Sequence, residues 1–425
     1  MSEANRPQGR LGVVHQAAAH ASGGGRYPAD HETYAPAEAI LMPATTADVR
    51  VLLERLVAFD TVSRNSNLDL LDFVTGRLAR HGVDSMLVRS DDGAKANLLA
   101  TIGPAVAGGV VLSGHTDVVP VEGQPWTSDP FRVVEREGRL YGRGTCDMKT
   151  FLAIALALVP EMSGLRRPIH LALSYDEEVG CRGAPRLIEA LLEHMPRPAA
   201  VIVGEPTEMR VVSAHKGIAV LRTVVTGHEA HSSQTHRGVS AVMTAARLIT
   251  HLDDCARRRA EHGPFAPGFD PPYTTIHVGT VHGGTAVNII SRECSFAWDI
   301  RSIPEDGPET ILADFREHCR TVLEPQMRLI GPGSAIETER MVEAPALAHE
   351  DLNPAIELAC RLAAVDTTEW VPFAAEAGLF QRAGLPSVIC GPGSIDQAHR
   401  PDEFITLEQL EAGLGFQRRL IKALS

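Results

Sequence analysis

The hydrophobic and polar positions along the first half of the chain predict two kinds of element. Apolar residues recur at helical spacing over 45–59 and again from about Leu68, where Gly82 is expected to end the second helix. Three short, continuous apolar runs of the kind typical of buried strands lie near Val110, Leu171 and Val201. Helical patterns over 149–159 and 186–194 separate these runs. This alternation predicts an α/β fold with a mostly parallel sheet flanked by helices.

The pattern changes after Gly217. Strand-like and helical segments there predict a small inserted α+β domain with an antiparallel sheet; they cover 219–227, 239–262, 274–284, 295–301 and 310–322. The α/β pattern returns after about Ala344. We therefore expect four segments: an N-terminal extension at 1–44, an α/β domain in two parts at 45–216 and 343–425, and the insert at 217–342.

Length, charge and cysteine content narrow the class of protein. A chain of 425 residues is long enough for two or three domains. A formal net charge of -13 argues against nucleic acid and anionic membranes as main partners, although it leaves a cationic substrate open. Seven cysteines without a CxxC pair indicate reduced thiols and a cytoplasmic location. The longest apolar run, 151–159, is too short to span a membrane. The first residues are interpreted as a flexible tail or small clasp, with a transit peptide as the alternative.

Metal-binding side chains follow the three buried runs. His115 comes after the first, Glu178 after the second and Glu205 after the third, while Asp147 lies in a turn before a helix. The carboxyl ends of parallel strands lie at one edge of the sheet, so we expect these residues to converge. Histidine and carboxylate ligands without thiolates are typical of a catalytic zinc, cobalt or manganese site. Singly, each residue has an ordinary structural explanation, such as a helix cap or a solvated turn.

One further histidine is a candidate to complete this site. His399 lies in "GPGSIDQAHRPDEF", between a glycine-rich turn that lets the backbone approach closely and a stiffening Pro401. Two metal ions held about 3.5–4 Å apart need a bridging carboxylate, and a balanced pair needs a second imidazole. We therefore expect His399 to join the other four residues.

Several segments occur in the order found in a known family: "SGHTDVVPVEGQPWTSDPF", "GRGTCDMK", "DEEVGCRGA", "VGEPT", "GHEAHSS" and "GPGSIDQAHRPDEF". Over roughly 45–425 the chain resembles the M20 family of di-zinc amidohydrolases and peptidases. The segments "ICGPGSIDQAHRPDEF" and "EAGLFQRAG" are most similar to the branch that deacetylates N-acetyl-L-ornithine. The alternatives are another N-acyl amino acid, a succinylated diamino acid or a dipeptide as substrate, or a metal-binding protein without catalysis. The departures from the family pattern, including Ala374 and Ala375, concern the substrate and spare the ligands.

The resemblance implies two divalent metal ions, with zinc as the expected metal and cobalt as the alternative. One ion is held by His115 and Glu205, the other by Glu178 and His399, and Asp147 bridges them. The α/β domain is then the catalytic domain and the insert is a dimerisation or lid domain. The resemblance also implies a cis peptide bond between Asp147 and Met148.

Two acidic residues beside the ligands have expected roles. Asp117 follows His115 by two residues, so in an extended chain its carboxylate can reach back to the imidazole and fix its tautomer. Glu177 is next to a ligand but is not needed as one. It is therefore the expected general base that takes a proton from the attacking water.

The remaining expected site residues lie in the insert and in the segment that follows it. His231 in "GHEAHSS" matches a histidine that in relatives reaches the active site of a neighbouring subunit, which implies a homodimer; His228 and His236 are nearby alternatives. The expected substrate-binding residues are Asn288 and Arg301 in the insert and Glu376 in the second part of the α/β domain. A structural salt bridge is the alternative for Arg301.

Overall fold

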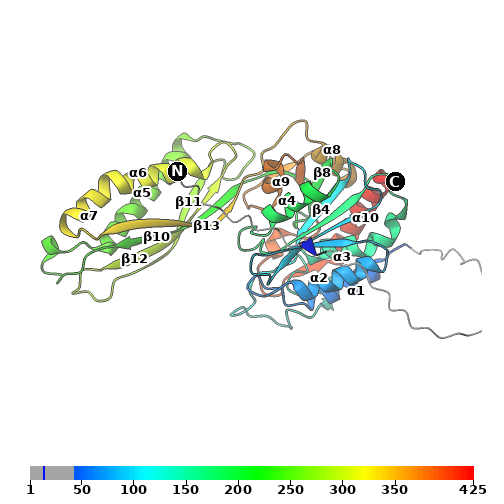
Figure 1. Ribbon diagram of the computed structural model, residues 1–425, viewed down its shortest axis with the longest axis horizontal. Coiled ribbons are helices and arrows are strands. Elements are labelled where there is room, and N and C mark those ends of the chain that lie inside the picture. The colour runs from blue at the N-terminus through cyan, green and yellow to red at the C-terminus, as the bar shows by residue number, and fades with distance from the viewer. Residues whose placement is uncertain (1–12, 15–42) are drawn as a thin grey trace, which may run out of the picture. The chain divides into compact units, whose positions relative to one another are not determined.

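The computed structural model describes residues 13–14 and 43–425 (Figure 1). The extension predicted at 1–44 lies outside the described residues apart from 13–14 and 43–44. The chain forms two compact units. Unit 1 contains the described residues up to Glu178, with Gly183–Met209 and Cys390–Ser425, and unit 2 contains Val179–Arg182 and Arg210–Ile389.

Unit 1 is built on a mixed sheet whose strand order is β1-β2-β3-β7-β4-β8. These strands are β1 (Val13–Val14), β2 (Ser85–Arg89), β3 (Ala96–Ile102), β4 (Val110–His115), β7 (Ile169–Ser174) and β8 (Ala200–Val203). The three predicted buried runs are β4, β7 and β8, and every residue in them is buried. β4 runs parallel to both neighbours, whereas β1, β2 and β3 add antiparallel pairs at one side. The predicted α/β class is confirmed.

Helices cover both faces of this sheet. They are α1 (Thr46–Val57), α2 (Leu68–Ala79), α3 (Lys149–Leu158), α4 (Ala184–His194) and α10 (Leu407–Leu424), and a 3-10 turn, η1 (Val159–Gly164), follows α3. α3 packs on β4 and contacts α1, α2 and α10, while α4 packs on β2, β3 and β7 from the opposite side (Figure 1). α1 begins at a capping box of Thr45 and Asp48. Every residue of α3 is buried, which matches its nearly uninterrupted apolar sequence.

A small antiparallel sheet completes unit 1. Its strands are β5 (Val134–Arg136), β6 (Arg139–Tyr141) and β16 (Phe404–Thr406), with β6 in the middle, and the 3-10 turn η4 (Ile395–Gln397) precedes β16. Phe404 pairs with Tyr141 in this ladder. The ladder therefore ties the segment after His399 to the chain just before Asp147.

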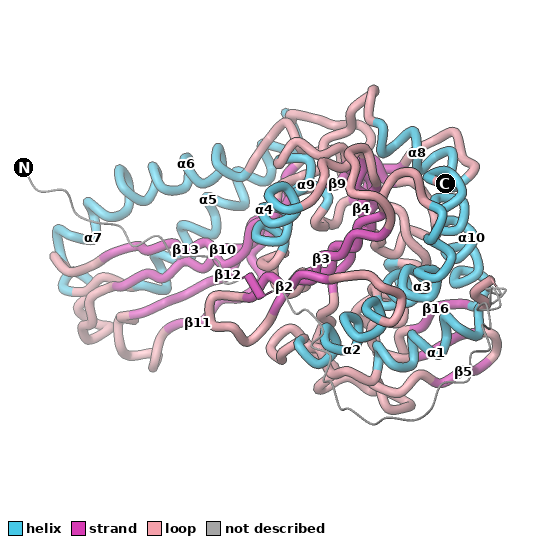
Figure 2. The backbone as a smooth tube through the Cα atoms, turned by 45° about the vertical axis from the view of Figure 1, so that its right-hand side comes forward, coloured by secondary structure: helices cyan, strands magenta, loops and turns pink. Residues whose placement is uncertain are grey.

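Unit 2 contains the antiparallel sheet that the sequence predicts. Its order is β11-β12-β10-β13, with β10 (Gly217–Thr226), β11 (Thr275–Gly283), β12 (Glu293–Ser302) and β13 (Ala335–Ala344). β12 alternates buried residues with residues that are half-buried or, at Glu293, exposed, as a strand with one covered face must. The helices that cover the sheet are α5 (Ala241–His262), α6 (Pro308–His318) and α7 (Glu324–Ile330), seen as tubes in Figure 2, with a π-helical turn, η3 (Cys319–Leu323), between the last two. The core between the layers includes Leu221, Leu248, Trp298 and Phe315.

The rest of unit 2 is a second, smaller group of elements. Its strands follow the order β15-β9-β14, with β9 (Val212–His215), β14 (Glu369–Val371) and β15 (Ser387–Ile389). The helices are α8 (Pro354–Ala363) and α9 (Ala377–Arg382), and η2 (Thr235–Arg237) is a short 3-10 turn. Among the described residues of the chain, no helix combines the length and apolar character that crossing a membrane requires.

Candidate active site

Three adjacent parallel strands of unit 1 deliver the predicted site residues to one edge of the sheet. β4 ends at His115, β7 is followed by Glu177 and Glu178, and β8 is followed by Glu205. Because β7, β4 and β8 are neighbours and parallel, their carboxyl ends meet. Asp147 lies just before α3, and all of these residues belong to unit 1.

The first cluster consists of His115, Asp147 and Glu205. The Nε2 atom of His115 lies 2.9 Å from Oδ1 of Asp147 and 3.9 Å from Oε1 of Glu205. All three residues are buried, and one donor atom from each lies within 4.8 Å of the others. This spacing suits three ligands of one cation.

The second cluster consists of Asp147, Glu178 and His399. The Nε2 atom of His399 lies 3.0 Å from Oε2 of Glu178 and 3.4 Å from Oδ2 of Asp147. The two oxygens of Asp147 therefore face different clusters, which is the arrangement expected of a bridging carboxylate. The structure brings together all five residues that the sequence analysis expected to meet, and the Asp147–Met148 peptide bond is cis as the resemblance implied.

Burial and crowding of carboxylates govern the electrostatics of both clusters. Burial and the charge of Asp147 raise the pKa of Glu205 well above its usual value and raise the pKa of Glu178. Burial alone would raise the pKa of Asp147, but hydrogen bonds from His115 and His399 lower it below its usual range. Burial alone would lower the pKa of His115, but Asp147 and Glu205 raise it well above its usual value. Hydrogen bonds to Asp147 and Glu178 raise the pKa of His399 to about 10. The chain alone therefore balances these carboxylates with protonated imidazoles.

The donor set fits a divalent metal. Oε1 of Glu205 is buried and has no hydrogen-bond partner among the described residues, which is costly unless a cation satisfies it. The donors of both clusters are imidazole nitrogens and carboxylate oxygens, a combination typical of zinc-type ions in catalytic sites. A bound cation would replace the protons on His115 and His399.

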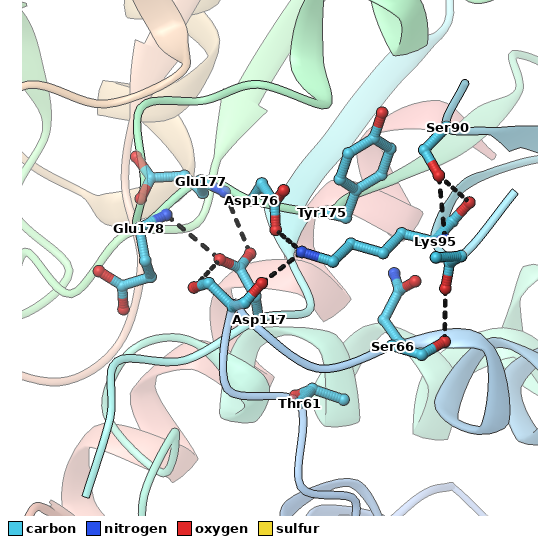
Figure 3. Close-up of polar contacts among 12 residues, drawn as sticks. Thr61, Ser66, Ser90, Lys95, Asp117, Tyr175, Asp176, Glu177 and Glu178 are labelled. Carbon is cyan, nitrogen blue, oxygen red and sulfur yellow. Dashed lines mark hydrogen bonds and ion pairs between the residues drawn. The ribbon is translucent and has the colours of Figure 1, made fainter. Parts of the chain in front are cut away.

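Asp117 holds a different partner from the expected one. Its carboxylate Oδ1 lies 3.7 Å from Nδ1 of His115, beyond hydrogen-bond distance, and the backbone carbonyl of Asp117 takes that contact at 2.9 Å. The carboxylate instead accepts hydrogen bonds from the backbone N–H groups of Glu177 and Glu178 (Figure 3). It also accepts a hydrogen bond from the hydroxyl of Ser63. Asp117 therefore fixes the imidazole through its carbonyl and the chain after β7 through its side chain.

Glu177 lies beside the clusters without belonging to either. Its charge contributes to raising the pKa of both His115 and Glu205. Its side chain extends away from Asp117, as does that of Glu178 (Figure 3). The preceding Asp176 has a positive φ of 57° and pairs with the ammonium group of Lys95, which holds this tight turn in place.

The sequence analysis missed one buried carboxylate that supports the site. Oε1 of Glu403 accepts hydrogen bonds from the N–H groups of Cys146 and Asp147, at 2.7 and 3.0 Å. Its Oε2 accepts from the N–H of Gly144 at 3.0 Å and from the guanidinium of Arg143 at 2.8 Å. Glu403 therefore shapes the loop that presents Asp147. The signal in the sequence is the acidic Pro-Asp-Glu corner that ends four residues after His399, but spacing alone does not show that Glu403 turns toward the loop before α3.

The other expected site residues, in the insert and at Glu376, lie in unit 2. His231 is exposed, and its Nδ1 lies 2.8 Å from the Ser233 hydroxyl. The backbone N–H of Ser232 donates to the carbonyl of Asn288, so the structure brings His231 and Asn288 together. Arg301 on β12 donates to Asp299 at 3.2 Å, in keeping with the salt-bridge alternative, and Glu376 is buried before α9.

Comparison with known proteins places this site in a family. The profile of "Peptidase family M20/M25/M40" matches residues 111–423. An acetylornithine deacetylase of Myxococcus xanthus is 34% identical over 380 residues, covering 87% of this chain and 95% of the relative. An acetylornithine deacetylase of Photorhabdus laumondii is 35% identical over 332 residues, covering 78% of this chain and 82% of the relative.

Solved structures share the fold at lower identity. A tripeptidase from Staphylococcus aureus has a TM-score of 0.69 at 20% identity, covering 90% of this chain and 99% of the neighbour. A dinuclear metal binding peptidase of the M20 family from Bacillus subtilis has a TM-score of 0.60 at 17% identity, covering 89% and 98%. The profile match and the curated relatives together show that the chain belongs to peptidase family M20/M25/M40 and is a metal-dependent amide hydrolase.

Proposed function

We propose that this protein removes the acetyl group from N-acetyl-L-ornithine, giving L-ornithine and acetate for arginine biosynthesis in the cytoplasm. The observation that supports hydrolysis is the pair of three-residue clusters that share Asp147. One carboxylate oxygen of Asp147 faces each cluster. The choice of substrate is supported by curated relatives named acetylornithine deacetylase, at 34% and 35% identity over most of the chain. A net charge of -13 suits a substrate that carries a free side-chain ammonium group.

The proposal includes two divalent ions. Zinc is the expected metal at both positions, and cobalt is the alternative. His115 and Glu205 would hold one ion, Glu178 and His399 the other, and Asp147 both. When bound, the ions would polarise the amide carbonyl and lower the pKa of the attacking water.

The chain's own residues then move and hold the protons. Glu177 accepts a proton from the attacking water and returns it to the nitrogen of the departing ornithine, which is the work of a general base followed by a general acid. Asp117 keeps Glu177 in place through the backbone N–H contact at 3.1 Å. Asn288, Arg301 and Glu376 are proposed to contact the amino-acid part of the substrate. For Arg301 this requires releasing Asp299, its present partner.

The proposal also includes a homodimer formed through the insert at 217–342, with His231 of one subunit acting at the metals of the other. β11 and β13 are the outer strands of the four-stranded sheet, and an outer strand offers backbone groups to a second copy. Mixing inactive His231→Ala and Glu177→Gln subunits should restore part of the activity, because one hybrid site receives both intact residues. Full activity in a monomer, or no recovery in proven heterodimers, would contradict this arrangement.

A panel of substrates tests the proposed reaction. The metal-loaded full chain should hydrolyse N-acetyl-L-ornithine with a kcat/KM at least about tenfold above that for other N-acetyl amino acids, an N-succinyl diamino acid and dipeptides, since tenfold corresponds to about 1.4 kcal/mol of discrimination. A preference for another compound in the panel would assign the protein to the alternative substrate class. Absence of turnover on every compound by a metal-loaded chain would support a non-catalytic protein.

A further inference from the structure

A second group of metal-binding side chains lies on two helices of unit 2. His251 and Cys255 are four residues apart on α5, and Asp314 and His318 are four residues apart on α6. Residues at i and i+4 share one face of a helix, so each helix presents a pair of donors. α5 and α6 contact each other, and the His251–Asp314 hydrogen bond shows that the two pairs face one another.

The donor atoms already have the spacing of a zinc site. Nε2 of His251 lies 3.1 Å from Oδ2 of Asp314, and Sγ of Cys255 lies 3.1 Å from the same oxygen and 3.7 Å from the nitrogen. In a tetrahedral site with ordinary zinc bond lengths, sulfur, nitrogen and oxygen donors are separated by roughly 3.3–3.6 Å. The observed distances of 3.1, 3.1 and 3.7 Å lie on either side of this range, so the three atoms lie near the corners of one face of a coordination tetrahedron.

A fourth donor and a route to the site are present. The ring of His318 stacks on that of His251, with centroids 4.1 Å apart and planes 8° apart. Both histidines line a surface hollow of about 450 Å³ that opens between α5 and the end of α6. A change of side-chain rotamer would turn a nitrogen of His318 toward the other three donors.

A cation already contacts this group. The guanidinium of Arg258 lies 2.9 Å from Sγ of Cys255 and 3.5 Å from Oδ2 of Asp314. The Arg258 side chain is 53% exposed, so it can leave for solvent, whereas Cys255 is buried and stays. The position therefore favours positive charge, and Arg258 is a competitor that a metal ion must displace.

We propose that His251, Cys255 and Asp314, with His318 as the fourth donor, bind one zinc ion that fastens α5 to α6. A thiolate combined with imidazole and carboxylate donors suits zinc. The clusters of the candidate active site contain no thiolate, so the two sites differ in chemistry. On binding, the Cys255 thiol gives its proton to solvent and the sulfur forms the bond to zinc.

Cobalt is the probe, because a cobalt–thiolate bond absorbs in the near-ultraviolet and bonds to imidazole and carboxylate do not. The full-length, reduced and metal-stripped protein is titrated with Co²⁺. A thiolate band should grow until one ion per chain occupies this site, and added Zn²⁺ should remove the band. Cys255→Ser should abolish the band, whereas Cys360→Ser, on the separate helix α8, should leave it unchanged. No band in the wild type, or a band that survives in Cys255→Ser, overturns the proposal.

Two further variants keep the test decisive if Cys255→Ser does not fold. Asp314→Asn, at an exposed position, should weaken Co²⁺ binding at the band by at least about tenfold, because a neutral amide replaces an anionic ligand. Arg258→Ala should tighten binding, because it removes the competing cation. If the four side chains form only a hydrogen-bonded cluster, Arg258→Ala lowers thermal stability and metal affinity does not respond to either change. That result would also overturn the proposal.

Discussion

Replacing Glu403 by glutamine tests whether a residue that touches no expected substrate atom controls the candidate active site. The side chain is 1% exposed and receives four hydrogen bonds, two on each carboxylate oxygen. Glutamine offers one oxygen and one NH₂ group, and the NH₂ group is itself a donor. In either orientation of the amide, the NH₂ group faces two N–H donors, so two of the four hydrogen bonds are lost. Arg143, also 1% exposed, loses its anionic partner as well.

The expected loss is large because a buried charge remains behind. Removing one partner of a buried ion pair costs about 3–5 kcal/mol in the free energy of unfolding. That is a substantial share of the roughly 5–15 kcal/mol that stabilises an ordinary domain. The N–H of Asp147 is among the donors that lose support in one of the two orientations, so the carboxylate shared by both clusters should be held less firmly. We expect metal affinity to fall by about 10- to 100-fold, the range found when groups that orient a ligand are removed.

Two measurements check these numbers on the same protein. Urea unfolding of the metal-free chain gives the change in stability, and competition with a chromophoric chelator gives the change in metal affinity. Glu122→Gln is the matched control, because Glu122 makes an exposed ion pair with Arg64 and should change neither quantity measurably. An unfolding free energy of Glu403→Gln within about 0.5 kcal/mol of wild type, with unchanged metal affinity, would refute the role assigned to Glu403.

Three shorter predictions follow from other parts of the structure. Glu177→Gln should retain the wild-type metal content and lose turnover, whereas Glu178→Gln should lose metal; equal metal loss in both variants would contradict a general-base role. Lys95→Met removes the partner of Asp176 in the turn before Glu177 and should lower kcat more than it raises KM, and an unchanged kcat would show that the turn holds without it. Burial lowers the pKa of His215 from 6.5 to about 4, so between these pH values the unfolded chain binds a proton that the folded chain does not. The free energy of unfolding should therefore fall as pH drops through this window, by up to about 3 kcal/mol. Urea unfolding of His215→Gln should show a free energy of unfolding that lacks this contribution to the pH dependence.

The sequence predicted the elements whose residues have one dominant environment. The apolar runs that become β4, β7 and β8 are buried along their whole length, so a continuous hydrophobic pattern identifies them. The helical periodicity over 45–59 predicted the first helix, and Thr45 closes a capping box with Asp48 at its start. Four of the metal-binding residues were predicted because each follows such a strand or precedes a predicted helix, and parallel strands bring their ends together. His399 was predicted because a balanced pair of ions needs a second imidazole.

Elements whose hydrophobic pattern is weak or short were missed. β13 alternates between exposed and half-buried residues over most of its length and carries four charged side chains, so its sequence resembles a solvated segment. β2 has five residues, too few for its alternating pattern to stand out beside the turn that follows. The predicted helix over 310–322 is α6 followed by a π-helical turn, a change of hydrogen-bond pattern that apolar periodicity does not reveal.

Contacts between segments far apart in sequence are the second feature that the sequence alone did not predict. Spacing placed Asp117 next to His115, but the partner of its carboxylate depends on where the chain turns after β7, and there the backbone of Glu177 and Glu178 offers two N–H groups. Glu403 likewise acquires its role only because β16 pairs with β6 and brings it beside the loop before α3. Periodicity and spacing therefore identify which groups can act as ligands, whereas the pairing of distant strands decides which groups orient them. A metal site needs the groups that orient its ligands as well as the ligands themselves. A site predicted from ligand spacing alone therefore omits residues, such as Glu403, whose replacement would weaken metal binding although they contact no metal.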